Sequence, residues 1–196
     1  MVTMGNRRMS QSLRVEAWLI TGIPGSGKST IAHLLGTHFR HAAHIEGDRL
    51  QEWIVSGRVL PGQPPPDEEE RQIRLCIRNQ CLLARSFAEA GFIPVLDYVV
   101  VSQARLAYYR AHLDDMQLNV VVLAPGRKVA LERDRNRPEK TVAEEWAHLE
   151  DEIRRELSGM GLWVDNGPLS AEQTLTFILQ EQARARVHFP IIDNEF

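Results

Sequence analysis

A glycine-rich segment near the start of the chain constrains its fold most strongly. Residues 22–29 read Gly-Ile-Pro-Gly-Ser-Gly-Lys-Ser and match the phosphate-binding loop pattern G-x-x-x-x-G-K-[ST] without a gap. The apolar run 17–20 before them has the length of a strand, and residues 30–35 behind them have the apolar spacing of a helix. Strand, loop and helix in this order are the context that the pattern requires. The segment therefore predicts a nucleotide-binding loop rather than an ordinary glycine-rich turn.

The chemistry of phosphate binding explains these residue types. Glycines let successive backbone N–H groups turn toward phosphate oxygens, and the N-terminus of the following helix presents a positive partial charge to the same anion. Lys28 is expected to reach the β- and γ-phosphates, and Ser29 to ligate magnesium. The residues expected to contact ATP or GTP are Gly22, Ile23, Pro24, Gly25, Ser26, Gly27, Lys28, Ser29 and Thr30.

Length, charge and cysteine content narrow the class of protein. The 196 residues suit a single domain, which at this size buries about 70% of its unfolded surface. A net charge of -3 argues against a general binder of nucleic acids or membrane surfaces, and no apolar stretch is long enough to predict a membrane span. The two cysteines, Cys76 and Cys81, share one apolar helical pattern, which favours reduced thiols and a cytoplasmic location.

Strand-like and helix-like patterns alternate along the chain. The strand-like runs are 17–21, 43–46, 92–101, 118–124 and 162–164. This alternation predicts a parallel sheet covered by helices on both faces. We expect a single domain over residues 15–190, preceded by a flexible leader of residues 1–14.

Helix boundaries can be placed in three regions. A helix from about Asp67 to Ala90 begins with acidic residues, which suit the positive end of a helix dipole. Capping boxes at residues 141–144 and 170–173 mark the starts of two further helices.

Two segments are candidates for mobile loops. Residues 56–66 are rich in proline and glycine and predict a flexible flap. Residues 131–140 are crowded with charges and are broken at Pro138.

With the phosphate loop, an acidic residue after the second strand and an arginine-rich segment after the fourth, the chain resembles the small P-loop kinases. That group includes nucleoside monophosphate, shikimate, gluconate and adenylylsulfate kinases and the chloramphenicol phosphotransferase type. The resemblance covers roughly residues 17–180. It implies the three-layer α/β fold of P-loop NTPases: a five-stranded parallel sheet with the first strand in the middle, helices on both faces and a nucleotide at the carboxyl edge. An arginine-bearing lid would lie near residues 131–140.

Two carboxylates match positions of the family plan. Asp48 follows the second strand, where these kinases place a carboxylate that faces the acceptor hydroxyl, so it is our candidate base; a turn-forming aspartate is the alternative. Asp97 lies near the end of the third apolar run, where a Walker-B-like acid would hold magnesium through water. A substrate contact or a structural hydrogen bond is the alternative for Asp97, because a carboxylate in a buried strand needs a partner. Which of the two is the base stays open.

The arginine-rich segment resembles the lid signature of these kinases. Arg133 and Arg137 are four residues apart and would emerge on one side of a helix, where the resemblance implies that they counter the charge on the transferring phosphoryl group. The alternative is a solvated, self-paired run of charges. The family also places adenine near the loop after the last strand, here residues 165–168.

A further group of arginines bears on the acceptor. Four of them form one stripe along the long helix, which would favour an anionic acceptor if it faced the cleft, although a solvated face is the simpler interpretation. These are Arg71, Arg74, Arg78 and Arg85.

The resemblance implies an ATP-dependent phosphotransferase that uses magnesium and acts on a small hydroxylated molecule as its only expected partner. The competing hypotheses are a nucleic-acid end kinase, against which the acidic pI argues, a nucleotide-binding switch or ligand-sequestering resistance protein without turnover, and a hydrolase that uses water. The acceptor and the oligomeric state are left open.

Overall fold

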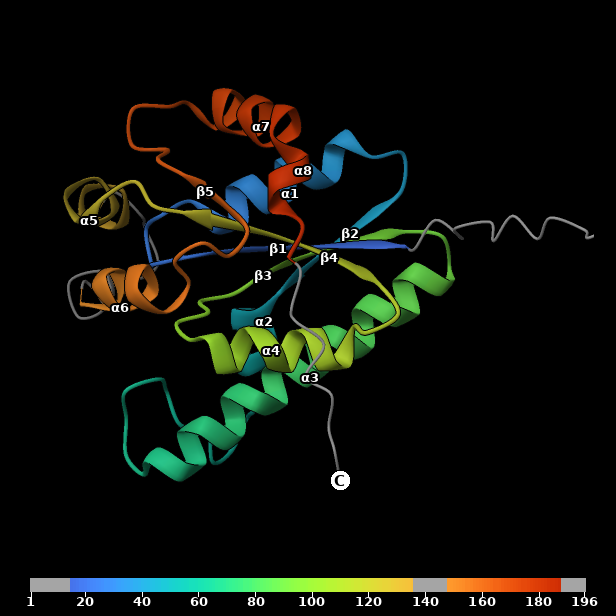
Figure 1. Cartoon of the computed structure of the whole chain (residues 1–196). Helices are drawn as coiled ribbons and strands as arrows, with labels where there is room; N and C mark the ends of the chain where they lie inside the picture. Colours follow the sequence, from blue (N-terminus) through green and yellow to red (C-terminus); the bar gives the residue numbers. More distant parts are fainter. Residues whose placement is uncertain (1–14, 136–147, 188–196) are drawn as a thin grey trace, which may run out of the picture.

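A computed structural model describes residues 15–135 and 148–187 of the chain (Figure 1). Its five strands are β1 (Glu16–Gly22), β2 (Ala42–Glu46), β3 (Ile93–Asp97), β4 (Gln117–Leu123) and β5 (Leu162–Val164). The helices within these ranges are α1 (Lys28–His38), α2 (Gly47–Glu52), α3 (Pro66–Glu89), α4 (Gln103–His112), α5 (Arg127–Arg135), α6 (Leu149–Glu156), α7 (Ala171–Gln180) and α8 (Gln182–Ala185).

The strands form one sheet in the order β2-β3-β1-β4-β5, and every pair is parallel. The carboxyl ends of the strands therefore meet at one edge. In register, Asp97 at the end of β3 is opposite Ile20 of β1 on one side and Glu46 of β2 on the other. Segments that leave these strand ends are brought together at the same edge, which is where open parallel sheets bind ligands.

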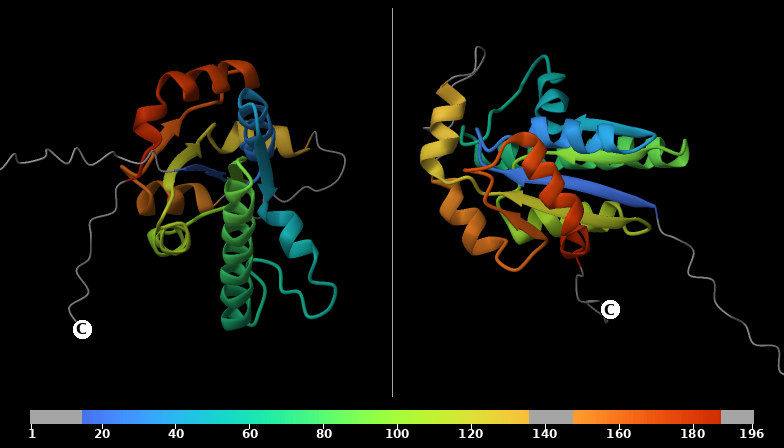
Figure 2. Two further views of the ribbon diagram at one scale, coloured as in Figure 1. Left: turned by 90° about the vertical axis from the view of Figure 1, so that its right-hand side faces the viewer. Right: turned by 90° about the horizontal axis from the view of Figure 1, so that it is seen from above.

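Alternating side chains of β1 divide the core into two clusters. Ala17 and Leu19 pack with apolar residues of α3, α4 and α6, whereas Trp18 and Ile20 pack with those of α1, α7 and α8. Figures 1 and 2 show the resulting three layers, with α1 and α7 on one face of the sheet and α3 and α4 on the other. This arrangement is the period-two pattern of a sheet buried on both faces.

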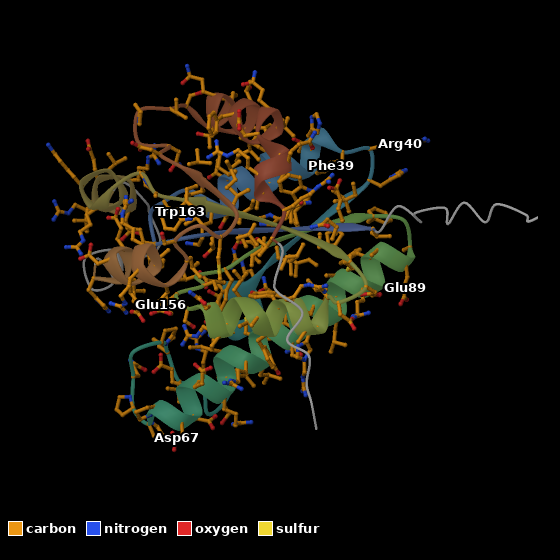
Figure 3. All side chains as sticks on the ribbon, viewed as in Figure 1. Phe39, Arg40, Asp67, Glu89, Glu156 and Trp163 are labelled. Atoms are coloured by element: carbon orange, nitrogen blue, oxygen red, sulfur yellow. The ribbon has the colours of Figure 1, made fainter. Side chains whose placement is uncertain are left out.

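One part of the molecule projects from this body. The first half of α3 extends beyond the sheet together with the connection that follows α2 (Figures 1 and 2). In Figure 3 the labelled Asp67 and Glu89 mark the two ends of α3, and the Asp67 end is the projecting one. We call residues 47–75 the arm. It comprises α2, the connection 53–65 and the start of α3.

The three-layer sheet and its order agree with the sequence-based expectation, and all five strand-like runs contain a strand. The third run is longer than its strand, because β3 ends at Asp97 and residues 98–101 leave the sheet. The capping box at residues 170–173 is present at the start of α7. The leader of residues 1–14 and the capping box at residues 141–144 lie outside the described residues. Within the described ranges, none of the helices is both long and apolar enough to cross a membrane.

Candidate functional site at the carboxyl edge

The phosphate loop connects β1 to α1 and is shaped by glycines with positive φ. Gly25 and Gly27 have φ angles of 79° and 94°, a region that residues with a Cβ avoid. A Cβ at Gly25 would also lie 2.2 Å from the carbonyl oxygen of Ala130, so α5 packs directly on the loop. The sequence-predicted loop therefore has the backbone conformation that turns N–H groups inward around an anion.

Lys28 is the first residue of α1, and its side chain turns back over the loop. Its Nζ donates a hydrogen bond to the carbonyl oxygen of Ile23 at 3.2 Å. Ser29 and Thr30 follow in the first turn of α1, where the backbone N–H groups have no intrahelical acceptors. The ammonium group, the hydroxyl groups and the helix N-terminus thus gather at one end of the loop.

A cavity of about 290 Å³ lies beside the loop. Its lining comes from the loop, α1, α5, α7 and the segment after β5, namely Gly25, Gly27, Thr30, Ile31, Arg133, Asn166, Leu169, Ala171 and Thr174. The cavity borders residues 165–168, the segment near which the resemblance placed the nucleobase.

Asn166 links that segment to the phosphate loop. Its side chain is 3% exposed, and Nδ2 donates to the carbonyl oxygen of Ser26 at 2.9 Å. Within the described ranges, the buried Oδ1 of Asn166 and Oγ of Ser26 have no hydrogen-bond partner. Buried polar atoms in proteins normally have one. Of these two residues Asn166 lines the cavity, whereas Ser26 is fully buried and does not. The resemblance pointed to residues 165–168 as a segment and did not single out the side chain of Asn166.

The side chain of Arg133 is engaged by the segment that follows β5. Its Nη2 donates to the carbonyl oxygens of Asn166 at 2.8 Å and Gly167 at 3.4 Å, and it lines the cavity. A role on the transferring phosphoryl group would require it to leave these carbonyls. Arg137, the second arginine of the expected lid, lies outside the described residues, which end at Arg135 on this side.

Asp48 lies in the first turn of α2, immediately after β2, and its side chain is exposed. The turn that carries it is fixed from below. A Cβ at Gly47 would lie 2.4 Å from the ring of Tyr98, and the thiol of Cys76 donates to the Gly47 carbonyl oxygen at 3.2 Å. Burial, and to a smaller extent the charge of Asp48, raises the pKa of Cys76 to about 12. The turn that carries the Asp48 carboxylate thus packs on the uncharged side chains of Tyr98 and Cys76.

Asp97 has a different environment. It is 4% exposed, and its Oδ2 lies 2.7 Å from Nε2 of His44 on the neighbouring strand. The partner that a buried acid requires is therefore a histidine, an interaction that the sequence analysis did not foresee. Of the two candidate carboxylates, Asp48 is therefore exposed, whereas Asp97 is buried and paired with His44.

Gln80 of α3 ties the strand ends together. Its Nε2 donates to the carbonyl oxygens of Ile45 and Asp97 at 2.8 and 3.0 Å, and its Oε1 accepts from the hydroxyl of Tyr109. Gln80 is fully buried, so this network fixes the relative position of β2 and β3 just before the two carboxylates. The only feature of the sequence that could have pointed to Gln80 is its position on the apolar face of α3, where a polar residue needs a buried partner.

No protein-family model matches the sequence, and no curated protein matches it. Comparison with solved structures gives strong matches. A sugar kinase from Janibacter sp. HTCC2649 is 16% identical, with a TM-score of 0.63 over 89% of this chain and 99% of that one. A gluconokinase from Sinorhizobium meliloti 1021 is 17% identical, with a TM-score of 0.62 over 87% and 93%.

A tunicamycin resistance protein from Deinococcus radiodurans is 21% identical, with a TM-score of 0.60 over 90% of this chain and 100% of that one. Likeness at such low identity shows a common fold and leaves the activity open. The strand order 2-3-1-4-5, the phosphate loop and these neighbours agree, and the chain has the fold of the small P-loop kinases.

Proposed function

We propose that the protein is an ATP-dependent phosphotransferase that moves the γ-phosphoryl group to a hydroxyl group of a small acceptor. The observation that carries this proposal is the placement of Asp48 directly after β2 at the same sheet edge as the phosphate loop and Lys28. Transfer chemistry uses a carboxylate at such a position to accept the proton of the hydroxyl group.

The residues present fit a nucleotide. The cavity beside the loop would hold the nucleobase between Arg133 and α7, and the unpartnered Oδ1 of Asn166, a residue that lines the cavity, suits a polar ligand. The phosphate chain would follow the loop toward the N-terminus of α1, where Lys28 supplies a compact cation. Ser29 and Asp97 are the residues that would hold magnesium, which when bound neutralises charge on the β- and γ-phosphates.

Asp48 is the better candidate for the base. Its carboxylate is exposed, whereas Asp97 is engaged by His44. In the transfer, the acceptor oxygen forms a bond to the γ-phosphorus as the bond between that phosphorus and the bridging oxygen breaks. The hydroxyl proton passes to Asp48 and ADP leaves. Orientation of the hydroxyl in line with the phosphorus supplies much of the acceleration.

The arginines are assigned different tasks. Arg133 would form one wall of the base cavity, a change from the phosphoryl-facing role that the resemblance implied. Arg137 stays a prediction for the phosphoryl-facing position.

The test is acceptor-stimulated ADP production in a screen of small hydroxylated compounds, with the phosphorylated product identified by mass. We expect at least one compound to gain a phosphoryl group in the wild-type protein and far less in the Asp48→Asn variant. ATP consumption that no compound stimulates, and that Asp48→Asn leaves unchanged, would contradict the proposal.

A second candidate is a protein that binds ATP and sequesters a ligand without turnover. The likeness to a tunicamycin resistance protein favours it, because resistance can arise from sequestration. The Asp48→Asn variant separates the two candidates. In a sequestering protein this variant keeps the ligand affinity and the resistance that it confers, whereas in a kinase it loses turnover.

A further inference from the structure

The carboxylate of Asp97 is held by a single side chain. Asp97 is buried, and its Oδ2 lies 2.7 Å from Nε2 of His44. Among the described residues, this is the one hydrogen bond or ion pair that the carboxylate makes. A carboxylate can accept through both of its oxygens. The contact with His44 therefore fixes one oxygen of Asp97 and leaves the other for a further partner.

The pair lies on the face of the sheet that α1 covers. Val95, two residues before Asp97 on β3, packs in the core cluster of α1 and α7, and residues two apart on a strand share a face. The ring centroids of His44 and His33 are 6.3 Å apart, and His33 belongs to α1. Asp97 and His44 therefore face α1 rather than α3.

The side of α1 that meets this pair also carries Ser29. Ser29 and His33 are four residues apart, so their side chains lie one above the other, separated by about 6 Å along the helix axis. Because α1 starts at the phosphate loop and leads back to a parallel strand, Ser29 is nearer the carboxyl edge than His33.

Asp97 and His44 differ in level in the same sense. His44 is in register with Val95, so Asp97 lies two residues, or about 7 Å, nearer the carboxyl edge than His44. Ser29 is thus above His33 on the helix, and Asp97 is above His44 on the sheet. This places Ser29 and Asp97 at a similar level, as a shared magnesium ion requires.

The backbone of Asp97 has little freedom. Its carbonyl oxygen accepts from Nε2 of Gln80 at 3.0 Å, and it is in register with Ile20, two residues before the first glycine of the phosphate loop. The orientation of the carboxylate then depends on the side-chain torsions of Asp97. The hydrogen bond with His44 selects one of their staggered states.

We propose that His44 is a positioning residue for magnesium. Its imidazole holds Oδ2 of Asp97, so that the other oxygen of the carboxylate is presented to the ion. This inference rests on the proposed function for the assignment of magnesium to Ser29 and Asp97. Carboxylates that serve metal ions are commonly hydrogen-bonded in turn, and loss of such a partner typically lowers metal affinity 10- to 100-fold.

The experiment compares two replacements of His44. His44→Gln keeps an N–H donor at a similar reach, whereas His44→Leu removes the donor and keeps much of the volume. Binding of Mn²⁺, which prefers the same oxygen ligands, is measured by electron paramagnetic resonance in the presence of a non-hydrolysable ATP analogue. We expect His44→Leu to weaken Mn²⁺ binding about 10- to 100-fold and His44→Gln to stay within about threefold of the wild type.

A double-mutant cycle tests whether His44 acts through Asp97. In an Asp97→Asn background, His44→Leu should weaken Mn²⁺ binding by less than about a further twofold, because the carboxylate that it positions is gone. Calorimetry without metal should give the same affinity for the ATP analogue in all variants. Urea unfolding reports their stability. If His44→Leu does not fold, His44→Asn replaces it, since its shorter amide cannot reach Oδ2.

Two further variants serve as comparisons. His41→Leu removes an exposed histidine that contacts the ring of Phe92, and it should leave Mn²⁺ binding unchanged. Glu46→Gln alters another carboxylate at this level of the sheet, because Glu46 is in register with Asp97. Mn²⁺ binding that depends on Glu46 and is unchanged in Asp97→Asn would overturn the inference.

The inference is also overturned if His44→Leu binds Mn²⁺ as tightly as the wild type, or more tightly, because His44 would then compete with the ion for the carboxylate. A full effect of His44→Leu in the Asp97→Asn background overturns it as well. Mn²⁺ binding needs no acceptor, so the outcome is separate from the test of the kinase. Dependence of Mn²⁺ binding on His44 without phosphorylation of any acceptor would support the inference and contradict the proposed transfer reaction.

Discussion

The nucleotide side and the arm are built in different ways. On the nucleotide side, Gly25 lies against the carbonyl oxygen of Ala130, and Asn166 donates to the carbonyl oxygen of Ser26. On the arm, side chains such as Trp53 are exposed and the charges pair with one another. The first region is defined by backbone geometry, which many sequences can adopt, and the second by side-chain chemistry. The difference is consistent with a chain that is less than 25% identical to these structural neighbours and still shares their fold.

The largest effect is expected on the nucleotide side. Lys28→Ala should weaken ATP binding and lower phosphoryl transfer below detection, because Lys28 at the start of α1 is the residue that we propose contacts the β- and γ-phosphates. Titration calorimetry with ATP and an ADP-production assay measure the two effects. Lys128→Ala on α5 is the matched control, since this lysine is exposed. Unchanged affinity and turnover in Lys28→Ala would remove the phosphate-loop assignment.

The next effect tests the boundary between the two regions. Asp48→Asn should leave ATP binding nearly intact and lower acceptor turnover by roughly 10²- to 10⁴-fold, the range for a positioned acid–base group. Asp97→Asn should instead raise the magnesium requirement. Steady-state kinetics at several magnesium concentrations separate the two variants. If Asp48→Asn kept full turnover while Asp97→Asn lost it without a magnesium effect, the base would be Asp97.

A smaller effect is expected for Asn166, which joins the base segment to the phosphate loop. Asn166→Ala removes one hydrogen bond to Ser26 and should raise the KM for ATP about two- to tenfold with little change in kcat, as one neutral hydrogen bond contributes about 0.5–1.5 kcal/mol. Initial rates at varied ATP concentration give both constants. An increase in the acceptor KM with an unchanged ATP KM would show that the two regions are not separate at this residue.

The smallest effect concerns stability beneath the arm. Burial raises the pKa of Cys76 and of Cys81 from 9.0 to about 12, so the unfolded chain loses these protons before the folded one does. The contribution of these thiols to the free energy of unfolding is therefore fully present below pH 9. Above pH 9 it falls by up to about 1.4 kcal/mol per thiol for each pH unit. Urea unfolding at pH 8, 9 and 10 measures the slope. The Cys76→Ala variant should lose its share of that slope, and an equal slope in variant and wild type would contradict the role of burial.

Much of the fold follows from local patterns, and the site follows only in part. The phosphate loop, the five strands and the capping box at residues 170–173 were predicted because each depends on a short stretch of residues. Three contacts were not predicted. They are the pair of His44 with Asp97, the hydrogen bond from Asn166 to Ser26 and the hydrogen bond from Gln72 to the backbone between α2 and α3. Each joins residues distant in sequence, and spacing along a chain carries no information on such pairs.

Arg133 shows the same limit for a residue whose role was inferred by resemblance. Its place in the arginine-rich segment indicated the phosphoryl group, and that role stays a prediction. In the structure its guanidinium group donates to the carbonyl oxygens of Asn166 and Gly167, contacts that the sequence did not indicate. The segment 56–66 was expected to be a flexible flap, which stays a prediction; in the structure, side chains of α3 form hydrogen bonds with its backbone. Composition does not reveal such side-chain-to-backbone hydrogen bonds.

The close approach of Gly47 to Tyr98 has a consequence for exchanging acceptor specificity between proteins of this fold. Because a Cβ at position 47 would enter the aromatic ring of Tyr98, a donor segment 47–75 can replace the arm on its own only if it keeps glycine at position 47. A donor with any other residue there requires a smaller side chain at position 98 as well. The unit of recombination is then a patch in space that joins the arm to a residue after β3.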